Sequence, residues 1–223
     1  MANYLELSHR IDSRTPLPSG VPPFKFDHHY SIARGDDANM FMLHFSNHTG
    51  THMDAPWHVV ASGLRIGELP LEDFVFERPA CLDVSLHEGE MIEPVHLEPH
   101  GELLGRCDLL LLRTGFSVMR KEDPQRYAMQ SPGVSIAAAA HLAANFPKLR
   151  AIGLDTISIA CMQHLDQGLE AHRTLLSGEG RRFLIIEDMN LQHDLSRLNR
   201  VIALPLFIEG IDSAPCTVIG VIG

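Results

Sequence analysis

Three histidines and one aspartate fall within the run HTGTHMDAPWH, from His48 to His58. Imidazole and carboxylate together form a ligand set suited to Zn²⁺ or Mn²⁺. The four side chains, His48, His52, Asp54 and His58, occupy positions of one parity, so an extended chain would direct them to the same face. The chain holds 14 histidines, and any single one is better explained as a hydrogen-bonded surface or core residue. The spacing of the whole group, however, predicts a metal site.

The residues between these ligands decide whether their side chains can meet. In a straight strand His48 and His52 would lie about 13 Å apart, at roughly 3.3 Å per residue. Two imidazoles that far apart cannot both reach one ion at about 2 Å each. Gly50 and Pro56 disfavour a helix here. A turn at Gly50, which tolerates positive φ, would instead fold His48 back toward His52, and Pro56 would stiffen the chain that holds His58 beside the metal.

Short apolar runs separated by turn residues predict the elements that position these side chains. Residues 12–23 are a Pro-rich loop, too interrupted for a helix or a central strand. The clearest helix covers 134–145, where Ser135 can cap the first turn and Pro147 follows the end. Strand-forming residues predict strands at 40–48, 80–86, 108–113, 151–155 and 183–187. We expect the first strand to deliver His48 and the third to be buried on both faces.

Two of these strands end in a carboxylate, Asp155 and Glu187. Acids at strand ends often lie at the rim of a sheet, so both are candidates to join the metal, although such an acid is more often solvated or caps a turn. His172, in EAHRTLL, would alone pass as an ordinary helix residue. If the last strand continues, Asp188 should face away from Glu187.

Composition bounds the class of protein. A chain of 223 residues with 45% hydrophobic content can bury a full core, and no repeat or linker divides it, so residues 1–223 are expected to form one domain. The formal net charge of −10 argues against nucleic acid and against anionic membrane surfaces. Four scattered cysteines without a C-x-x-C pair, and an N-terminus without an apolar signal segment, indicate a reduced, cytoplasmic protein. No apolar run approaches the length of a membrane span, and we expect a small-molecule substrate.

The run HTGTHMDAPWH resembles the H-x-G-T-H-x-D-x-P-x-H signature of the cyclase family of metal-dependent hydrolases, which includes bacterial kynurenine formamidase and isatin hydrolase. Further motifs similar to those of the family follow in the same order along the chain. They are LSH at 7–9, LLRTG at 111–115, GLDTIS at 153–158, and ALPL at 203–206 with Gly210, Asp212 and Pro215 after it. The resemblance implies an α/β fold, the single swivelling β/β/α domain of the family with mixed sheets and few helices. It also implies a homodimer or homotetramer.

The resemblance further implies roles for individual residues. His48, His52 and Asp54 would bind a first divalent ion, with Asp54 able to bridge to a second. His172 and Glu187 would complete a two-metal site. His58 matches the residue that donates and accepts the proton. The implied ligands of one or two Zn²⁺ or Mn²⁺ ions are His48, His52, Asp54, His172 and Glu187.

The reaction implied by this resemblance is hydrolysis of a small amide of the kynurenine formamidase type. A metal-activated water would attack the carbonyl, and His58 would carry a proton to the leaving amine. Hydrolysis of an isatin-type lactam or an ester, and ring closure by a cyclase, remain open. One departure concerns the substrate: formamidases carry an aromatic residue before the Pro-Gly of the N-terminal loop, where this chain has Pro18 and Ser19. Trp57, Phe24 or Phe26 are alternative sources of an aromatic ring.

Two rival classes are less well supported. A serine or cysteine nucleophile would need an activating motif, and the chain has no G-x-S-x-G elbow. A non-catalytic protein in which a metal only stabilises a loop would more typically use a closed, cysteine-rich site. Here no cysteine lies in the ligand run and an extra histidine is present, which favours an open, catalytic site.

Overall fold

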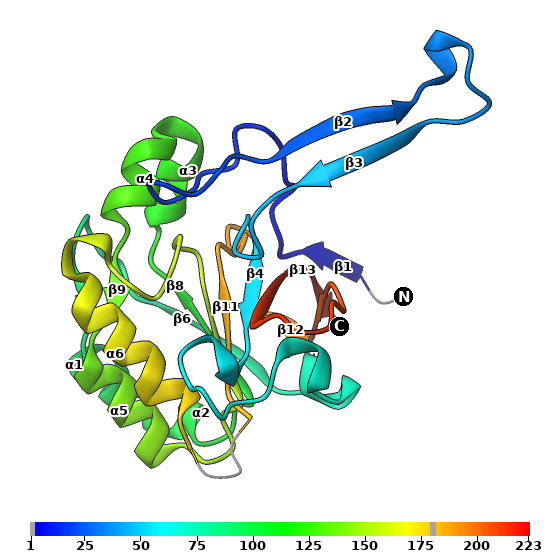
Figure 1. Ribbon diagram of the computed structural model, residues 1–223. Helices are drawn as coiled ribbons and strands as arrows, with labels where there is room; N and C mark the ends of the chain where they lie inside the picture. Colours follow the sequence, from blue (N-terminus) through cyan, green and yellow to red (C-terminus); the bar gives the residue numbers. More distant parts are fainter. Residues whose placement is uncertain (1–2, 179–181) are drawn as a thin grey trace.

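The computed structural model describes residues 3–178 and 182–223, and in them a nine-stranded mixed sheet dominates (Figure 1). The strand order is β5–β12–β13–β4–β11–β10–β8–β6, and β1 pairs with the second half of β13. The strands of this sheet are β1 (Asn3–Glu6), β4 (His52–Asp54), β5 (Val75–Phe76), β6 (Pro79–Asp83), β8 (Leu109–Arg113), β10 (Ala151–Leu154), β11 (Leu184–Glu187), β12 (Leu198–Pro205) and β13 (Ser213–Ile222).

The centre of this sheet is buried on both faces. Strands β6, β8, β10 and β11 run parallel to one another. Along β8, Leu110 and Leu112 belong to one hydrophobic cluster, whereas Leu109 and Leu111 belong to a second. Alternation along a strand sends successive side chains to opposite faces, so the two clusters lie on the two faces of the sheet. The expectation of a strand buried on both faces at 108–113 is confirmed.

Helices cover one face and the curled part of the sheet covers the other. Figure 1 shows α1, α2, α5 and α6 on one side of the central strands, with β12 and β13 on the other. β12 also contacts β6 at the far end of the strand order, so the sheet curls over itself. This layering is the β/β/α arrangement expected from the resemblance. The helices are α1 (Pro94–Leu97), α2 (Gly101–Leu104), α3 (Met119–Glu122), α4 (Pro124–Gln130), α5 (Ile136–Asn145) and α6 (Leu165–Leu176).

The helix expected at 134–145 is present as α5, and the Ser135 side chain accepts a hydrogen bond from the Ala138 backbone N–H, as a cap should. The Pro-rich loop 12–23 contains neither helix nor strand. Two short strands, β7 (Met91–Ile92) and β9 (Gly133–Val134), form a separate parallel pair. In the described residues, none of the helices combines the length and apolar character needed to cross a bilayer.

The strand expected at 40–48 differs from the prediction. β3 (Met40–His44) ends four residues before His48 and pairs with β2 (Lys25–Tyr30) as a two-stranded ribbon outside the main sheet. Every residue of both strands is exposed. The alternation that predicted a strand was therefore correct, but this strand has no place in the core.

Candidate metal centre and active site

Strand β4 carries two of the candidate ligands between two partner strands. It pairs antiparallel with β11, where His52 faces Glu187, and with β13, where Asp54 faces Ser213. Met53 packs in the cluster beneath β12 and β13, so His52 and Asp54 point to the opposite face. The parity argument from the sequence therefore holds for these two side chains.

A turn at Gly50 brings His48 to the same place. Gly50 has a φ of +68°, and the ring centroids of His48 and His52 lie 4.9 Å apart. A straight strand would have separated these residues by about 13 Å. The carbonyl oxygen of Gly50 also lies 2.9 Å from His52 Nδ1. The predicted turn is confirmed, and it both folds the chain and orients a ring.

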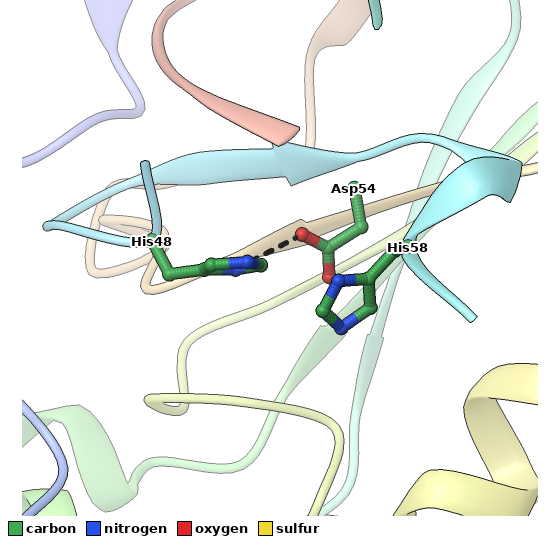
Figure 2. Close-up of side chains that lie close together, drawn as sticks. All are labelled: His48, Asp54 and His58. Atoms are coloured by element: carbon green, nitrogen blue, oxygen red, sulfur yellow. Dashed lines mark ion pairs between the residues drawn. The ribbon is translucent and has the colours of Figure 1, made fainter. Parts of the chain in front are cut away.

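Pro56 begins a short 3₁₀ turn, Pro56–His58, that delivers the third histidine. The His58 ring lies 4.7 Å from the His48 ring, and His48 Nδ1 is 3.3 Å from Asp54 Oδ1. Figure 2 shows the side chains of His48 and His58 on either side of the Asp54 carboxylate. One ligand atom from each of these three residues can lie within 4.8 Å of the others, which makes them one possible metal group.

A second group shares Asp54 with the first. His52 Nε2 is 3.2 Å from Glu187 Oε2, and His172 Nε2, on α6, is 3.3 Å from Glu187 Oε1. Asp54 approaches both histidines, at 3.7 Å and 3.8 Å. The structure thus brings all six candidates together and places Asp54 between the two groups. It also places His52 with Glu187 and His172, whereas the resemblance had assigned His52 and His48 to the same ion.

The donor set fits a metal ion. Among the described residues, His52 Nε2 and both carboxylate oxygens of Asp54 are buried without a hydrogen-bond partner, an arrangement that costs free energy unless another group satisfies them. His172 Nδ1 lies 2.8 Å from the Gly168 carbonyl oxygen, as His52 Nδ1 does from Gly50. Each Nδ1–H can donate to its carbonyl, so Nε2, which lies beside the carboxylates, becomes an electron-pair donor for an ion once it has lost its proton.

The charged side chains of the two metal groups lie close enough to change one another's pKa. Burial would lower the pKa of His48, but the contacts with Asp212 and Asp54 outweigh it and raise this pKa to about 10. Burial would raise the pKa of Glu187, but His172 and His52 hold it well below its usual range. The buried Glu187 carboxylate is therefore kept ionised by neighbouring positive charge, a role that a divalent cation would also fill.

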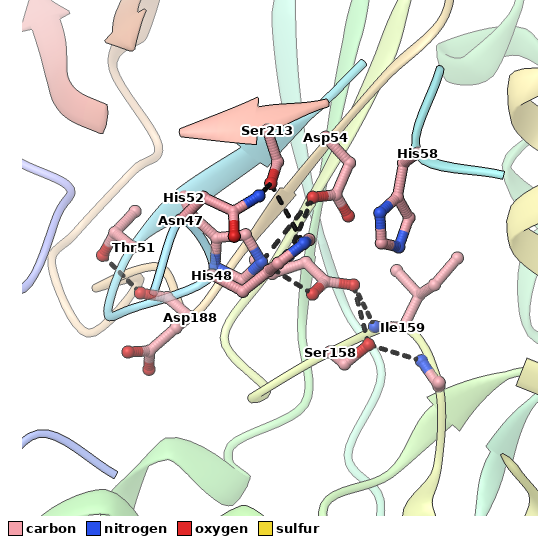
Figure 3. Close-up of polar contacts among 12 residues, drawn as sticks. Asn47, His48, Thr51, His52, Asp54, His58, Ser158, Ile159, Asp188 and Ser213 are labelled. Atoms are coloured by element: carbon pink, nitrogen blue, oxygen red, sulfur yellow. Dashed lines mark hydrogen bonds and ion pairs between the residues drawn. The ribbon is translucent and has the colours of Figure 1, made fainter. Parts of the chain in front are cut away.

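Three further residues complete the site, and no role in it was predicted for them from the sequence. Asp212, in the loop before β13, lies with Oδ2 2.6 Å from His58 Nδ1, and Asn47 Nδ2 donates to its Oδ1 at 2.7 Å. Ser158 Oγ donates to Glu187 Oε1 at 2.9 Å, and the Ile159 backbone N–H donates to the same oxygen (Figure 3). The only signal for Asp212 and Ser158 was their place in motifs similar to those of the family.

Asp188 faces away from the metal groups, although β11, whose continuation was the condition of that expectation, ends at Glu187. It follows Glu187 directly, has a φ of +52°, and is fully buried. Arg120 donates two hydrogen bonds to its carboxylate and the Tyr127 hydroxyl donates a third. The Thr51 hydroxyl donates to its backbone carbonyl, which ties this network to the turn before β4 (Figure 3).

Asp155 was a candidate to join the metal, and this prediction is wrong. Its carboxylate accepts hydrogen bonds from the backbone N–H and hydroxyl of Thr114 and from the Gly115 N–H. It therefore closes the turn after β8. Trp57, one possible substrate contact, instead packs against the Arg65 guanidinium, 4.5 Å from the ring centroid.

The chain belongs to the Cyclase family, whose model, described as "Putative cyclase", matches residues 5–160. An "Uncharacterized protein" of Haemophilus influenzae is 37% identical over 114 residues, which are 51% of this chain and 80% of that protein.

Solved structures show the same fold. Isatin hydrolase A from Labrenzia aggregata, bound to benzyl benzoate, superposes with a TM-score of 0.81 at 23% identity, over 99% of this chain and 94% of the other. A "predicted metal-dependent hydrolase" from Bacillus stearothermophilus superposes with a TM-score of 0.76 at 24% identity, over 99% and 98%. At these identities the likeness establishes the fold, and the chemistry is argued from the residues.

Proposed function

We propose that this protein is a metal-dependent hydrolase that cleaves the C–N bond of a small amide, in the manner of a kynurenine formamidase. The observation that carries the proposal is the buried group of ligand atoms on His52 and Asp54 that have no hydrogen-bond partner, beside the His58–Asp212 pair. A closed structural site would leave no reason for an additional oriented histidine at its edge.

Two overlapping sets of residues would hold one or two Zn²⁺ or Mn²⁺ ions. Asp54 belongs to both sets and would bridge them. A divalent ion bound there would supply activated water at neutral pH and polarise a carbonyl oxygen. The other members are His48 on one side and His52, His172 and Glu187 on the other.

His58 would move the proton that amide cleavage requires. Its Nδ1 donates to Asp212, which fixes the tautomer and leaves Nε2 to take a proton from water and deliver it to the leaving nitrogen. Asn47 holds the other oxygen of Asp212, so the acceptor itself cannot rotate freely. This arrangement supports the proposal that His58 carries a proton and is not a ligand, although His58 also lies within the first metal group.

A cyclic amide is the second candidate substrate. The fold likeness to isatin hydrolase A supports it, because opening a lactam and cleaving a formyl amide need the same attack on a carbonyl carbon and the same protonation of nitrogen. The Pro18–Ser19 departure from the formamidase loop leaves the two substrate classes to experiment.

The test is a substrate panel on protein reconstituted with Zn²⁺ or Mn²⁺, comparing N-formylkynurenine, isatin and simple aryl esters. Hydrolysis of N-formylkynurenine that a chelator abolishes and the metal restores would support formamidase activity. Turnover of isatin or an ester alone would assign the site to that substrate. If metal is bound and no substrate of the panel is hydrolysed, the proposal is wrong for formyl amides, lactams and aryl esters. A non-catalytic protein with a structural metal is then favoured.

A further inference from the structure

The chain turns sharply one residue after the candidate ligand Glu187. Asp188 has a φ of +52°, and among the residues that the structure describes it is the only one other than glycine with a positive φ. This left-handed conformation costs free energy in an L-residue, and residues held in it cluster at functional sites. Aspartate adopts it more readily than most residues do, so the contacts around Asp188 must decide whether the turn has a role.

Two short helices hold the Asp188 carboxylate. Arg120, on α3, donates from Nε to Oδ1 and from Nη2 to Oδ2, both at 2.8 Å. The Tyr127 hydroxyl, on α4, donates to Oδ1 at 2.7 Å. The carboxylate is fully buried and the Arg120 side chain is only 15% exposed, so water and salt screen this pair little. A bidentate arginine fixes the direction of a carboxylate as well as its position, and we call these three contacts the Asp188 clamp.

The backbone N–H of Asp188 reaches the segment that holds Glu187. It donates to the Thr156 carbonyl oxygen at 2.8 Å, and the Thr156 hydroxyl donates to the Ser158 carbonyl oxygen. The Ser158 hydroxyl and the Ile159 N–H in turn donate to Glu187 Oε1. A rotation of the backbone at Asp188 would therefore move Glu187 relative to the groups that orient its carboxylate.

The backbone carbonyl of Asp188 reaches the strand that carries His52. In the antiparallel register of β11 and β4, Glu187 faces His52, and this pair is the last at its end of the ladder. Just beyond it, the Thr51 hydroxyl donates to the Asp188 carbonyl oxygen (Figure 3). The same hydroxyl accepts a hydrogen bond from the His9 backbone N–H, which leaves its single proton for Asp188. A side-chain hydrogen bond thus keeps the two ligand strands aligned past their last pair.

A turn that served only the fold would need neither the aspartate nor the clamp. Glycine adopts a positive φ without steric cost. A buried ion pair adds little net stability, because the loss of hydration of both charges offsets their attraction. What the clamp does supply is a fixed orientation of one residue whose two backbone groups each lead to a candidate ligand.

We propose that Asp188 is a positioning residue for the metal centre. Clamped by Arg120 and Tyr127, it fixes the turn after β11, and its backbone groups hold Glu187 and His52 in place for one ion. This inference rests on the proposed function, since the ligands that Asp188 positions belong to that function. Its own carboxylate faces away from the two metal groups and does not bind the ion (Figure 3).

The test replaces Asp188 and uses Co²⁺ as the probe, because the visible absorption of bound Co²⁺ reports the geometry of its ligands. Asp188→Asn tolerates the left-handed φ but weakens the clamp, and Asp188→Gly adopts that φ freely but removes the clamp. We expect both variants to bind Co²⁺ about 10–100-fold more weakly than wild type, with altered absorption bands. Wild-type affinity and spectrum in Asp188→Gly would overturn the proposal, since the backbone conformation alone would then suffice.

The matched control is Asp108→Asn. Asp108 is also buried, accepts hydrogen bonds from the backbone N–H groups of Glu77 and Arg78, and lies 3.6 Å from Arg150. It precedes β8, which runs parallel to β10 and β11, so it lies at the opposite end of these strands from Glu187. We expect a lower Tm with the Co²⁺ affinity and spectrum of wild type. A control that loses Co²⁺ as the Asp188 variants do would show a general loss of stability and overturn the proposal.

Tyr127→Phe guards against Asp188 variants that fail to fold. It removes one donor of the clamp and leaves the buried ion pair with Arg120 in place. We expect Co²⁺ binding to weaken about tenfold, with shifted absorption bands. If this variant keeps the affinity and spectrum of wild type, the clamp does not position the ligands.

The Co²⁺ readout separates this inference from the proposed function. A wild type that binds Co²⁺ but hydrolyses no substrate of the panel contradicts the hydrolase alone, and the spectra of the variants still decide the role of Asp188. A wild type that binds no Co²⁺ overturns the metal centre and the positioning role together.

Discussion

Asp212 gives His58 an orientation that the HTGTHMDAPWH run cannot supply. The two residues are separated by 154 positions, yet their side chains meet at 2.6 Å because the loop before β13 passes beside the 3₁₀ turn at Pro56. His48 and His58, both in contact with Asp212, depress the pKa of its carboxyl, although burial opposes this effect. The carboxylate is therefore ionised at neutral pH and can accept the Nδ1–H of His58.

Replacement of His58 tests whether it carries protons or binds metal. We expect His58→Ala to keep its full metal content and to lose activity by about 10²–10⁴-fold, the usual contribution of one general acid–base group. Metal content is measured by mass spectrometry, and kcat is measured on the same preparation with whichever substrate of the panel the wild type hydrolyses. A variant that loses its metal would show that His58 is a ligand of the first group.

Replacement of Asp212 tests the orientation of the ring. Asp212→Asn keeps an oxygen that can accept from His58, so we expect kcat to fall roughly 10–100-fold with little change in KM, and Asp212→Ala to fall further. Asp83→Asn removes an exposed carboxylate paired with Arg113, outside the cluster, and is the control. Equal activity of the Asn and Ala variants would show that the acceptor oxygen does not matter.

The ligands could be predicted from the sequence, and the residues that orient them could not. His48, His52 and Asp54 lie close together in the chain. Their spacing and the glycine at position 50 were enough to predict the turn that brings their side chains together. Asp212 and Ser158 act through contacts between distant segments, which spacing does not record. The prediction for Asp155 was wrong because an acid at a strand end was expected at the metal, whereas its carboxylate accepts hydrogen bonds from Thr114, which is also distant in the sequence.

At the scale of elements, α6 must approach the sheet closely to present His172. Gly168, one turn before His172 on this helix, provides the carbonyl that orients the ring. A Cβ at Gly168 would lie 2.5 Å from Ala160 Cα and 2.4 Å from its Cβ. The segment that α6 touches, from Ser158 to Ala160, also holds Glu187. The close contact between Gly168 and Ala160 therefore affects the positions of both His172 and Glu187.

Gly168→Ala is expected to push α6 away from the sheet. Overpacking of this kind typically costs about 1–3 kcal/mol of stability, and the displacement should also weaken metal binding through His172. Gly101→Ala is the matched control, because a Cβ at this helical glycine meets nothing within 4 Å. Thermal unfolding and metal titration of both variants check the prediction. If both behave alike, the approach of α6 does not depend on Gly168.

The elements were predictable where burial dictates the pattern. The strand at 108–113 and the helix at 134–145 are confirmed because continuous apolar residues and a serine cap have few alternatives. The ribbon of β2 and β3 was only partly predictable. Alternation at 40–48 indicated a strand, but alternation cannot tell a strand in the core from one that is exposed to solvent.

At the scale of the whole molecule, the two metal groups place several charged side chains in the buried interior. Asp54 and Glu187 are buried beneath the sheet rim, and the positive charge that faces them comes from histidines. The pKa of His48 is raised to about 10 in the absence of an ion, so this ring is protonated at neutral pH and an incoming metal must displace the proton. Metal binding is therefore expected to weaken as the pH falls.

Removal of the metal should lower stability without unfolding the protein. A ligand present at 100 times its Kd stabilises the native state by about 2.7 kcal/mol, which corresponds to roughly 5–10 °C in Tm for a chain of this size. We expect the chelated protein to keep its far-UV circular dichroism, lose activity, and regain the Tm difference when Zn²⁺ or Mn²⁺ is added back. Asp54→Asn should show no such gain, since Asp54 belongs to both metal groups. The two hydrophobic cores on either side of the sheet do not include the metal ligands, so they should hold the fold when the ion leaves. Unfolding on chelation would instead identify a structural metal.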